Sequence, residues 1–324
     1  MTIPLLIIAF IATLLTTVLF EHYAIPFLRR FAKQPIYEGG PKWHLKKSGT
    51  PTMGGIGFAL AMLLVVCLSL PLLTSKLEGK ELLSITLCLV YALLNGAIGV
   101  IDDLAKLKKK ENKGLTPLQK LALQFTVTLI FLILKELLLP TKAFGITILG
   151  IDLSALILPL NLVITVYFVN CANLTDGIDG LATSVAFSIS FVLLLYLSIT
   201  KSPLTLLSAS LMGACIGFLI FNINPAKIFM GDTGALFLGG IISSICIVSD
   251  GVIMLPIIGI VYLLEGISVI LQVVVYKLSK KRLFKMAPLH HHLEKCGMSE
   301  NGICICAMII TLLSSLFVFP LIKL

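Results

Sequence analysis

The sequence predicts an all-α, polytopic integral membrane protein with about ten transmembrane helices. Hydrophobic residues make up 58% of the 324 residues, whereas charged residues make up only 13%. The mean hydropathy of +1.06 is far too high for a soluble globular protein. The apolar residues also fall into runs of about 20 residues, which is the length that a helix needs to cross a bilayer.

Ten such runs follow one another along the chain, and each predicts one spanning helix. Their approximate bounds are 3–21, 53–73, 82–101, 118–139, 153–170, 180–199, 204–221, 234–249, 252–276 and 303–322. The ninth run contains Pro256, Gly259 and Gly266, residue types that favour a bend or a break. Segment 140–152 has alternating isoleucines and two glycines, a pattern that indicates a small hairpin on the outer face. No repeat or linker divides the chain, so we expect one integral membrane domain over residues 1–324.

Lysine and arginine are distributed unevenly between the two sets of connecting loops. The loops at 22–52, 102–120, 222–232 and 277–302 contain 19 of the 25 basic residues. By the positive-inside rule this side is cytoplasmic, so both termini are expected outside. The same rule accounts for much of the net charge of +9, although some of these cations can also bind an anion.

Acidic and amide side chains gather at the loops of the predicted cytoplasmic face. Asp102 and Asp103 close the third run. Asn170, Asn173 and Asp176 recur every third residue, which places them along one side of the fifth helix if that helix continues past the membrane. An alternative is that these residues only mark helix ends, with Asp176 as the N-cap of the sixth helix. A similar capping role is open for the aspartate at the start of the eighth run, Asp232.

Carboxylates that share one face repel each other unless a cation or bound protons neutralise them. The chain has no Cys/His pairs at zinc spacing, so Mg²⁺ or Mn²⁺ with oxygen ligands fits better. Mg²⁺ is usually held by one or two carboxylates together with substrate phosphates, which indicates phosphoryl chemistry. Lys106, Lys113 and Lys120 follow the aspartate pair closely enough to neutralise a pyrophosphate. The triplet at 290–292 either ligates a metal or a phosphate, or is simply a polar loop.

A cation or proton-coupled transporter is the alternative from another functional class. Such proteins hold several acidic residues near the middle of the membrane. We expect Glu265 to be the only acidic residue well inside a span. This distribution favours a site at the membrane surface over an ion pathway.

Four stretches of the sequence resemble a known enzyme family: Lys47–Gly55, Asn173–Ala182, Phe229–Gly234 and Pro288–Glu294. In content and order they are similar to the polyprenyl-phosphate N-acetylhexosamine-1-phosphate transferases. The last stretch resembles the muramoyl-pentapeptide branch of this family. The resemblance covers essentially the whole chain. One departure is Ala235, where the family commonly has serine.

This resemblance implies a multi-pass enzyme of the bacterial cytoplasmic (inner) membrane, with its active site facing the cytoplasm. The implied reaction transfers phospho-MurNAc-pentapeptide from UDP-MurNAc-pentapeptide to undecaprenyl phosphate, with Mg²⁺, and gives lipid I and UMP. Membrane lipid is a further implied partner, a homodimer is compatible with the family, and no nucleic acid is expected. The related branch that uses UDP-GlcNAc as the donor stays open as an alternative, as does the choice between direct attack and an aspartyl-phosphate intermediate.

The resemblance also implies roles for individual residues. The catalytic positions are Asp102, Asp103, Asp232, His290, His291 and His292. Of these, Asp102 resembles the residue that deprotonates the lipid phosphate, and Asp232 resembles the principal metal ligand, together with Asp176. Phe229 resembles an aromatic residue that stacks on uracil. The substrate-binding positions are Lys47, Thr52, Lys106, Lys113, Lys120, Asn170, Asn173, Asp176, Asp179, Asn222 and Phe229.

Overall fold

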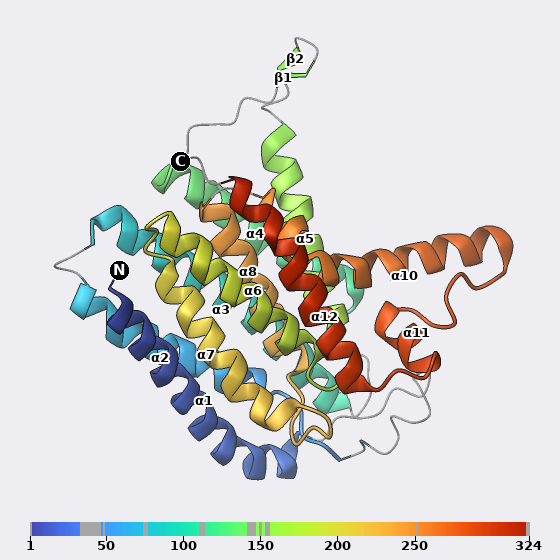
Figure 1. The fold of residues 1–324 in the computed structure, drawn as a ribbon. Helices are drawn as coiled ribbons and strands as arrows, with labels where there is room; N and C mark the ends of the chain where they lie inside the picture. The colour runs from blue at the N-terminus through green and yellow to red at the C-terminus, as the bar shows by residue number, and fades with distance from the viewer. Residues whose placement is uncertain are drawn as a thin grey trace.

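The computed structural model describes residues 2–32, 47, 49–73, 77–109, 114–140, 147–148, 151–152, 156–249 and 252–321. Its helices are α1 (Ile3–Phe31), α2 (Gly55–Leu73), α3 (Gly79–Lys109), α4 (Pro117–Leu138), α5 (Ile157–Thr175), α6 (Leu181–Ile199), α7 (Thr205–Asn222), α8 (Gly231–Ser249), α9 (Met254–Ile258), α10 (Ile260–Ser279), α11 (Leu289–Lys295) and α12 (Glu300–Ser315) (Figure 1). The 3₁₀ turn η3 (Leu316–Leu321) extends α12. Within this part of the chain, ten helices are long and apolar enough to cross a membrane, which confirms the predicted fold class.

Helix α8 lies in the middle of the bundle, in contact with α2, α3 and α5. Its close approach to two of these helices depends on glycine. Gly99 of α3 lies against the backbone of Asp232 and Thr233, and Gly234 of α8 lies against Gly55 of α2, so that a side chain at either position would overlap the neighbouring backbone. Small residues of this kind let membrane helices pack closely. The α3 contact brings the residues that follow Gly99 beside the first turn of α8.

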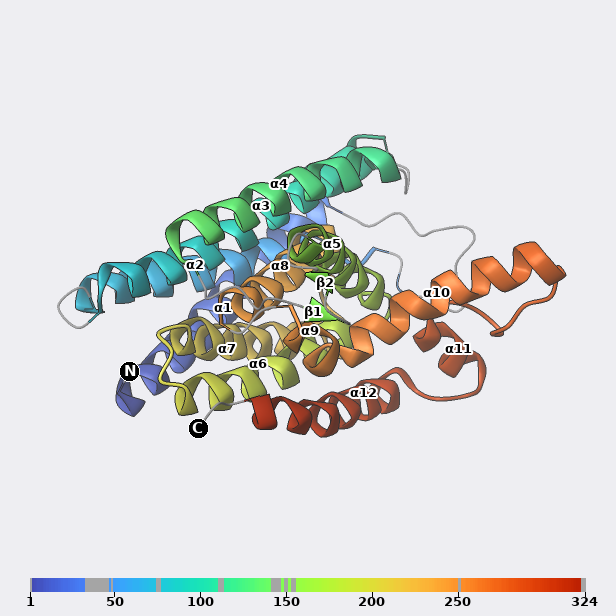
Figure 2. The same cartoon turned by 90° about the horizontal axis from the view of Figure 1, so that it is seen from above.

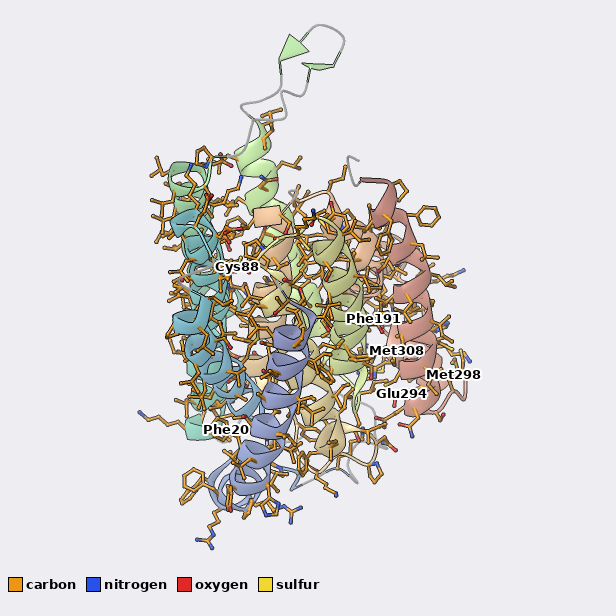
Figure 3. All side chains as sticks on the ribbon, turned by 60° about the vertical axis from the view of Figure 1, so that its left-hand side comes forward. Phe20, Cys88, Phe191, Glu294, Met298 and Met308 are labelled. Atoms are coloured by element: carbon orange, nitrogen blue, oxygen red, sulfur yellow. The ribbon has the colours of Figure 1, made fainter. Side chains whose placement is uncertain are left out.

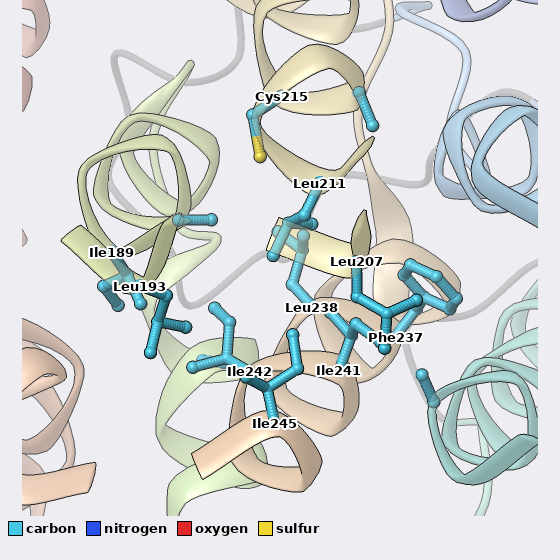
Figure 4. Packing of buried hydrophobic residues seen from close by; sticks show 14 of the residues in the cluster. Ile189, Leu193, Leu207, Leu211, Cys215, Phe237, Leu238, Ile241, Ile242 and Ile245 are labelled. Carbon is cyan, nitrogen blue, oxygen red and sulfur yellow. The ribbon is translucent and has the colours of Figure 1, made fainter. Parts of the chain in front are cut away.

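The core is built where α6, α7 and α8 face one another (Figure 4). Leu193, Leu211 and Ile242 are each fully buried there. Two edge-to-face ring contacts extend the core, since Phe58 of α2 packs against both Phe218 and Phe237 with ring centroids 5.3 and 5.8 Å apart. Removing such a side chain typically costs about 2–5 kcal/mol, so this layer fixes the arrangement of the central helices.

The outer surface of the bundle is apolar, as expected for helices that face lipid. Phe191 of α6 is 41% exposed (Figure 3), and α1 and α4 expose many leucine and isoleucine side chains along their length. Segment 140–152 contains the predicted hairpin, because β1 (Thr147–Ile148) pairs antiparallel with β2 (Ile151–Asp152).

The ninth span is divided, as predicted, and the break falls at Gly259, between α9 and α10. Gly259 lies against the ring of Phe168, where a side chain would overlap. Gly266 causes no break; it lies inside α10 and lets Cys171 and Tyr167 of α5 approach. Beyond this contact, α10 leans away from the rest of the bundle (Figures 1 and 2).

Two predicted boundaries were wrong. Helix α1 continues to Phe31 and α3 continues to Lys109, so Asp102 and Asp103 lie inside a helix rather than at its end. Glu265 is also not the only acidic residue within a candidate span, because the span Ile3–Phe31 contains Glu21, which is fully buried. Glu21 lies against Gly57, and neither of its carboxylate oxygens has a hydrogen-bond partner among the described residues.

Candidate active site

Three aspartates from two helices meet at one end of the bundle. Asp102 and Asp103 of α3 and Asp232 of α8 each place a carboxylate oxygen within 4.8 Å of the other two. The first two side chains are buried, and Asp232 is partly exposed. They meet because Gly99, about one turn before Asp102 on α3, allows that helix to lie directly on the start of α8.

Two lysines neutralise most of this carboxylate cluster. Lys106 Nζ lies 2.7 Å from Asp102 Oδ2 and 3.0 Å from Asp232 Oδ2. Lys120 Nζ lies 2.6 Å from Asp232 Oδ2 and also donates to Asn173 Oδ1 at 2.8 Å. Lys106 is four residues after Asp102, so both lie on the same face of α3. The repulsion expected among the carboxylates is therefore relieved largely by Lys106 of α3 and Lys120 of α4.

Asp103 caps the N-terminus of α8. Its Oδ2 accepts hydrogen bonds from Thr233 N at 3.0 Å and Thr233 Oγ1 at 2.8 Å, and its Oδ1 accepts from Asp232 N at 3.2 Å. A carboxylate at this position satisfies backbone N–H groups that have no partner within the helix and is favoured by the helix dipole. The alternative of a capping role for Asp232 is excluded, because Asp232 lies inside the first turn of α8.

The other oxygens of the cluster are also held. Asp102 Oδ1 accepts from Leu115 N at 2.7 Å, and Asp232 Oδ1 accepts from Asn173 Nδ2 at 3.0 Å. The continued fifth helix thus brings Asn173 to the cluster, as its spacing predicts. Asn170, one turn earlier, instead donates to Gln124 Oε1 of α4 and to Val166 O, both at 2.8 Å, so its amide group is used between helices.

Asp176 ends α5 as its C-cap. The alternative that it is the N-cap of α6 is excluded, because that position is occupied by Gly180 with φ +77°, a left-handed conformation that glycine adopts without strain. Desolvation raises the pKa of Asp176 well above its usual value, and the negative charges of Asp232, Asp103 and Asp179 raise it further. The charges of the carboxylate cluster therefore act on Asp176, although it is not one of the three residues whose carboxylate oxygens lie within 4.8 Å of one another.

A second charged group, formed by Lys47, Asp179 and Glu300, ties three distant segments together. Lys47 Nζ lies 2.7 Å from Asp179 Oδ1 and 2.7 Å from Glu300 Oε2. Glu300, in the first turn of α12, also accepts from Asp179 N at 2.9 Å. The remaining oxygen of Asp179 accepts from Asn224 Nδ2 and Ala226 N. Lys47 and Asp179 are site residues predicted from the sequence, whereas Glu300 is not.

The other residues predicted to bind substrate lie around this group and α8. Asn222 is buried; its Oδ1 accepts from Gly180 N and its Nδ2 donates to Ile228 O. The half-buried Phe229 bonds through its backbone, donating to Pro51 O. Thr52 is buried, and its hydroxyl lies beside Gly231 at the start of α8. Lys113 lies outside the described residues.

The three histidines of α11 have different surroundings. His290 is fully buried; its backbone N donates to the Glu265 carboxylate and its Nδ1 lies 3.1 Å from Glu265 Oε2. The His290 ring also lies against Gly177, where a side chain would overlap its Nε2. His291 Nδ1 lies 2.7 Å from Glu294 Oε2. His292 Nδ1 accepts from Lys285 N at 3.1 Å. His290 is thus placed against the loop that carries Asp176 and Asp179.

The fold and this site define a polytopic membrane protein with a charged, partly buried centre at one end of its helix bundle. A sequence profile of glycosyl transferase family 4 matches residues 85–250, about half of the chain. The phospho-N-acetylmuramoyl-pentapeptide-transferase of Caldicellulosiruptor bescii is 38% identical over 322 residues, which cover 98% of both chains.

The proteins of the same name from Halalkalibacterium halodurans and Rickettsia prowazekii are 42% and 40% identical, over 91% and 98% of this chain and 90% and 92% of their own. The chain therefore belongs to glycosyl transferase family 4 and, within it, to the phospho-N-acetylmuramoyl-pentapeptide-transferases. This membership agrees with the resemblance noted in the sequence.

Proposed function

We propose that this protein transfers phospho-MurNAc-pentapeptide from UDP-MurNAc-pentapeptide to undecaprenyl phosphate, and so makes lipid I and UMP for peptidoglycan synthesis. The observation that supports this most strongly is the carboxylate cluster of Asp102, Asp103 and Asp232 with its two lysines. The cluster lies in a chain that matches a phospho-N-acetylmuramoyl-pentapeptide-transferase over nearly its full length. The site suits charged phosphate groups, and the surrounding helices suit a lipid acceptor.

In this reaction an oxygen of the lipid phosphate attacks the phosphorus that bears MurNAc. The bond from this phosphorus to the bridging oxygen breaks, and UMP leaves with the electron pair. Such a transfer needs positioning and charge stabilisation more than covalent help. Lys106 and Lys120 each form an ion pair with Asp232 in this structure. They are the cations that can stabilise the departing UMP. Asp102 is proposed to accept the proton of the lipid phosphate; the proposal covers both direct attack and a route through an aspartyl-phosphate.

The residues at the cluster fit a hard divalent cation, because their donors are carboxylate oxygens from three side chains close together. We propose Mg²⁺, with Asp232 as the principal ligand and Asp176 as a second. When bound, the ion would draw negative charge from the pyrophosphate. The lysines now paired with Asp232 would then be free to contact substrate oxygens.

The nucleotide is proposed to lie between the carboxylate cluster and the Lys47 group. Lys47, Thr52 and Asn173 are the proposed polar contacts, and Phe229 is the proposed stacking partner of uracil. Asp179 and Asn222 bond mainly to the protein. Their contribution to nucleotide binding is thus to hold the surrounding loops in place.

We further propose that both termini face outward, that the active site faces the cytoplasm, and that the chain is one domain of the bacterial inner membrane. The basic loops support this orientation. A homodimer is proposed by resemblance alone. These proposals concern where the enzyme works and do not alter the chemistry.

The test is UMP release by purified protein in detergent with undecaprenyl phosphate and Mg²⁺. UDP-MurNAc-pentapeptide and UDP-GlcNAc are supplied in turn. We expect turnover with the first donor and little with the second, and loss of turnover when Mg²⁺ is chelated. Preferred use of UDP-GlcNAc would instead support the related branch. Cation uptake into proteoliposomes without UMP release would support the transporter alternative.

A further inference from the structure

A strongly basic region lies at the far end of α10, where the function proposed above does not use it. Between Glu265 and Glu294 the chain has five basic residues and no acidic one. All five are exposed, and none forms an ion pair with an acidic group in the part of the chain that the structure describes. They are Lys277, Lys280, Lys281, Arg282 and Lys285. We call residues 277–285 the basic turn.

The helix that leads to the basic turn stands apart from the bundle (Figures 1 and 2). From residue 267 to residue 275 its exposed side chains are apolar; Ile270 is 51% exposed and Val273 47%. A helix with this surface is stable in hydrocarbon rather than in water. Leu278 and Leu283 lie among the cations and are 83% and 49% exposed. Apolar side chains interleaved with lysine and arginine are typical of a segment at the headgroup level of a bilayer.

The basic turn is also joined to the histidine helix α11. Gln272 of α10 makes two hydrogen bonds to Phe284, accepting from its N at 2.9 Å and donating to its O at 3.4 Å. The Phe284 ring packs edge-on against His292, with centroids 5.6 Å apart. Lys285 N donates to His292 Nδ1 at 3.1 Å. Phe284 and Lys285 thus join the basic turn to His292.

We propose that the basic turn binds the phosphate headgroups of anionic membrane lipids, and that this contact orders α11. Each cation held near an anionic membrane surface strengthens the attraction by about five-fold, so a cluster without acidic neighbours has a strong preference for such lipids. Because the turn is fixed to His292 by Phe284 and Lys285, lipid at the turn restricts the motion of the helix that carries the three histidines.

The experiment measures backbone amide exchange of the whole protein in lipid nanodiscs. One preparation contains phosphatidylcholine alone, and the other contains phosphatidylglycerol as well. We expect the anionic lipid to slow exchange in residues 280–285 and 289–295, and this effect to fade in about 1 M salt. The test variant K277Q/K280Q/K281Q/R282Q should lose the effect. The matched control R29Q/R30Q/K108Q/K109Q removes four exposed cations from the ends of α1 and α3 and should keep it.

Three results would overturn the proposal. Equal loss in the control would mean that any exposed cations suffice, and an unchanged effect in the test variant would exclude the turn as the lipid site. Slower exchange in 280–285 without any change in 289–295 would refute the coupling. Gln272→Ala tests the coupling separately, because it should keep the lipid effect on the turn and weaken it on α11. If the test variant unfolds in phosphatidylcholine, the parent protein alone tests the proposal. Loss of the anionic-lipid effect in about 1 M salt supports it, and an effect that persists in salt overturns it.

Discussion

The three aspartates of the carboxylate cluster differ in what holds their side chains. Asp103 accepts three hydrogen bonds from the start of α8, whereas Asp232 accepts from two lysines and an amide. Asp103 is therefore held by the fold, while the partners of Asp232 are side chains that can move to a substrate. Asp102 lies between these cases, with one oxygen on a backbone N–H and the other on Lys106.

Asp232→Asn should abolish transfer while leaving the protein folded. The amide keeps the shape and can still accept a hydrogen bond, but it loses the charge that attracts Lys106, Lys120 and a divalent cation. We expect UMP release to fall by about 10²-fold or more, while cooperative thermal unfolding is retained. Glu136→Gln, on an exposed residue of α4, is the control. Near-normal turnover of the Asp232 variant at ordinary Mg²⁺ concentration would show that Asp232 takes no part in the reaction.

Asp103→Ala should lower stability as well as activity. It leaves the N–H groups of Asp232 and Thr233 without the acceptor that they have in the native protein. Loss of a helix cap typically costs about 1–2 kcal/mol, and chemical unfolding in detergent measures it. Ser202→Ala, which removes a side-chain acceptor of Leu204 N before α7, lies beyond the end of α6 that is far from Asp179 and should lower stability without the loss of activity. If Asp103→Ala were as stable as the parent, its capping role would be unimportant.

Glu300→Gln should weaken donor binding more than turnover. The amide can still accept from Asp179 N, but it loses the ion pair that orients Lys47. We expect the KM for UDP-MurNAc-pentapeptide to rise about ten-fold, the size of one charge-assisted hydrogen bond, with kcat little changed. Asn301→Ala, at the exposed neighbouring position, should leave both constants unchanged. A lower kcat at constant KM would show that Glu300 acts elsewhere.

Sequence reasoning found the aspartates because acidic residues are rare in this chain and sit at the ends of the apolar runs. It missed Glu300, because an acid in the first turn of a helix is ordinary and nothing local indicates that Lys47 lies 2.7 Å away. It also treated the histidines alike. Only tertiary contacts separate the buried His290 from His292, which bonds to the basic turn.

At the level of elements, hydropathy predicted the number and order of the spanning helices. Pro256, Gly259 and Gly266 together predicted a bend or break in the ninth span, and the structure places the break at Gly259. Hydropathy placed the ends of α1 and α3 too early, because it ends a span at the first charged residue. Helical backbone does not stop there: α3 continues beyond Asp103 to Lys109. That continuation puts Lys106 one turn after Asp102, where it pairs with the cluster.

Gly99→Leu tests whether the α3–α8 contact builds the site. A leucine side chain would overlap the backbone of Asp232 and Thr233, so α3 must move away from α8. We expect a loss of about 1–3 kcal/mol in stability and a larger loss of UMP release, because the aspartates separate. Gly79→Ala on the same helix has open space around it and is the control. Full activity of the leucine variant would mean that the cluster forms without this contact.

On the scale of the whole molecule, the site exists only because separate parts of the chain reach one end of the bundle. Asp103 bonds to α8, Lys120 of α4 bonds to Asn173 of α5, and Lys47 bonds to α12. An antiparallel course of the helices explains this, since the ends of odd-numbered spans and the starts of even-numbered spans share a face. The sequence predicts this convergence from topology, whereas the pairings depend on how the helices pack.

The same topology makes a prediction about orientation. Cys296 is exposed between α11 and α12, on the face that contains 19 of the 25 basic residues in the predicted loops, so it should face the cytoplasm. In a background with Cys67 and Cys306 replaced by serine, a membrane-impermeant maleimide should label Cys296 in inverted membrane vesicles and not in intact spheroplasts. Lys80→Cys, at an exposed position near the start of α3, should show the opposite pattern once Cys296 is also replaced. Labelling of Cys296 from outside would show that the orientation is the reverse of the expected one. The carboxylate cluster would then face away from a cytoplasmic nucleotide.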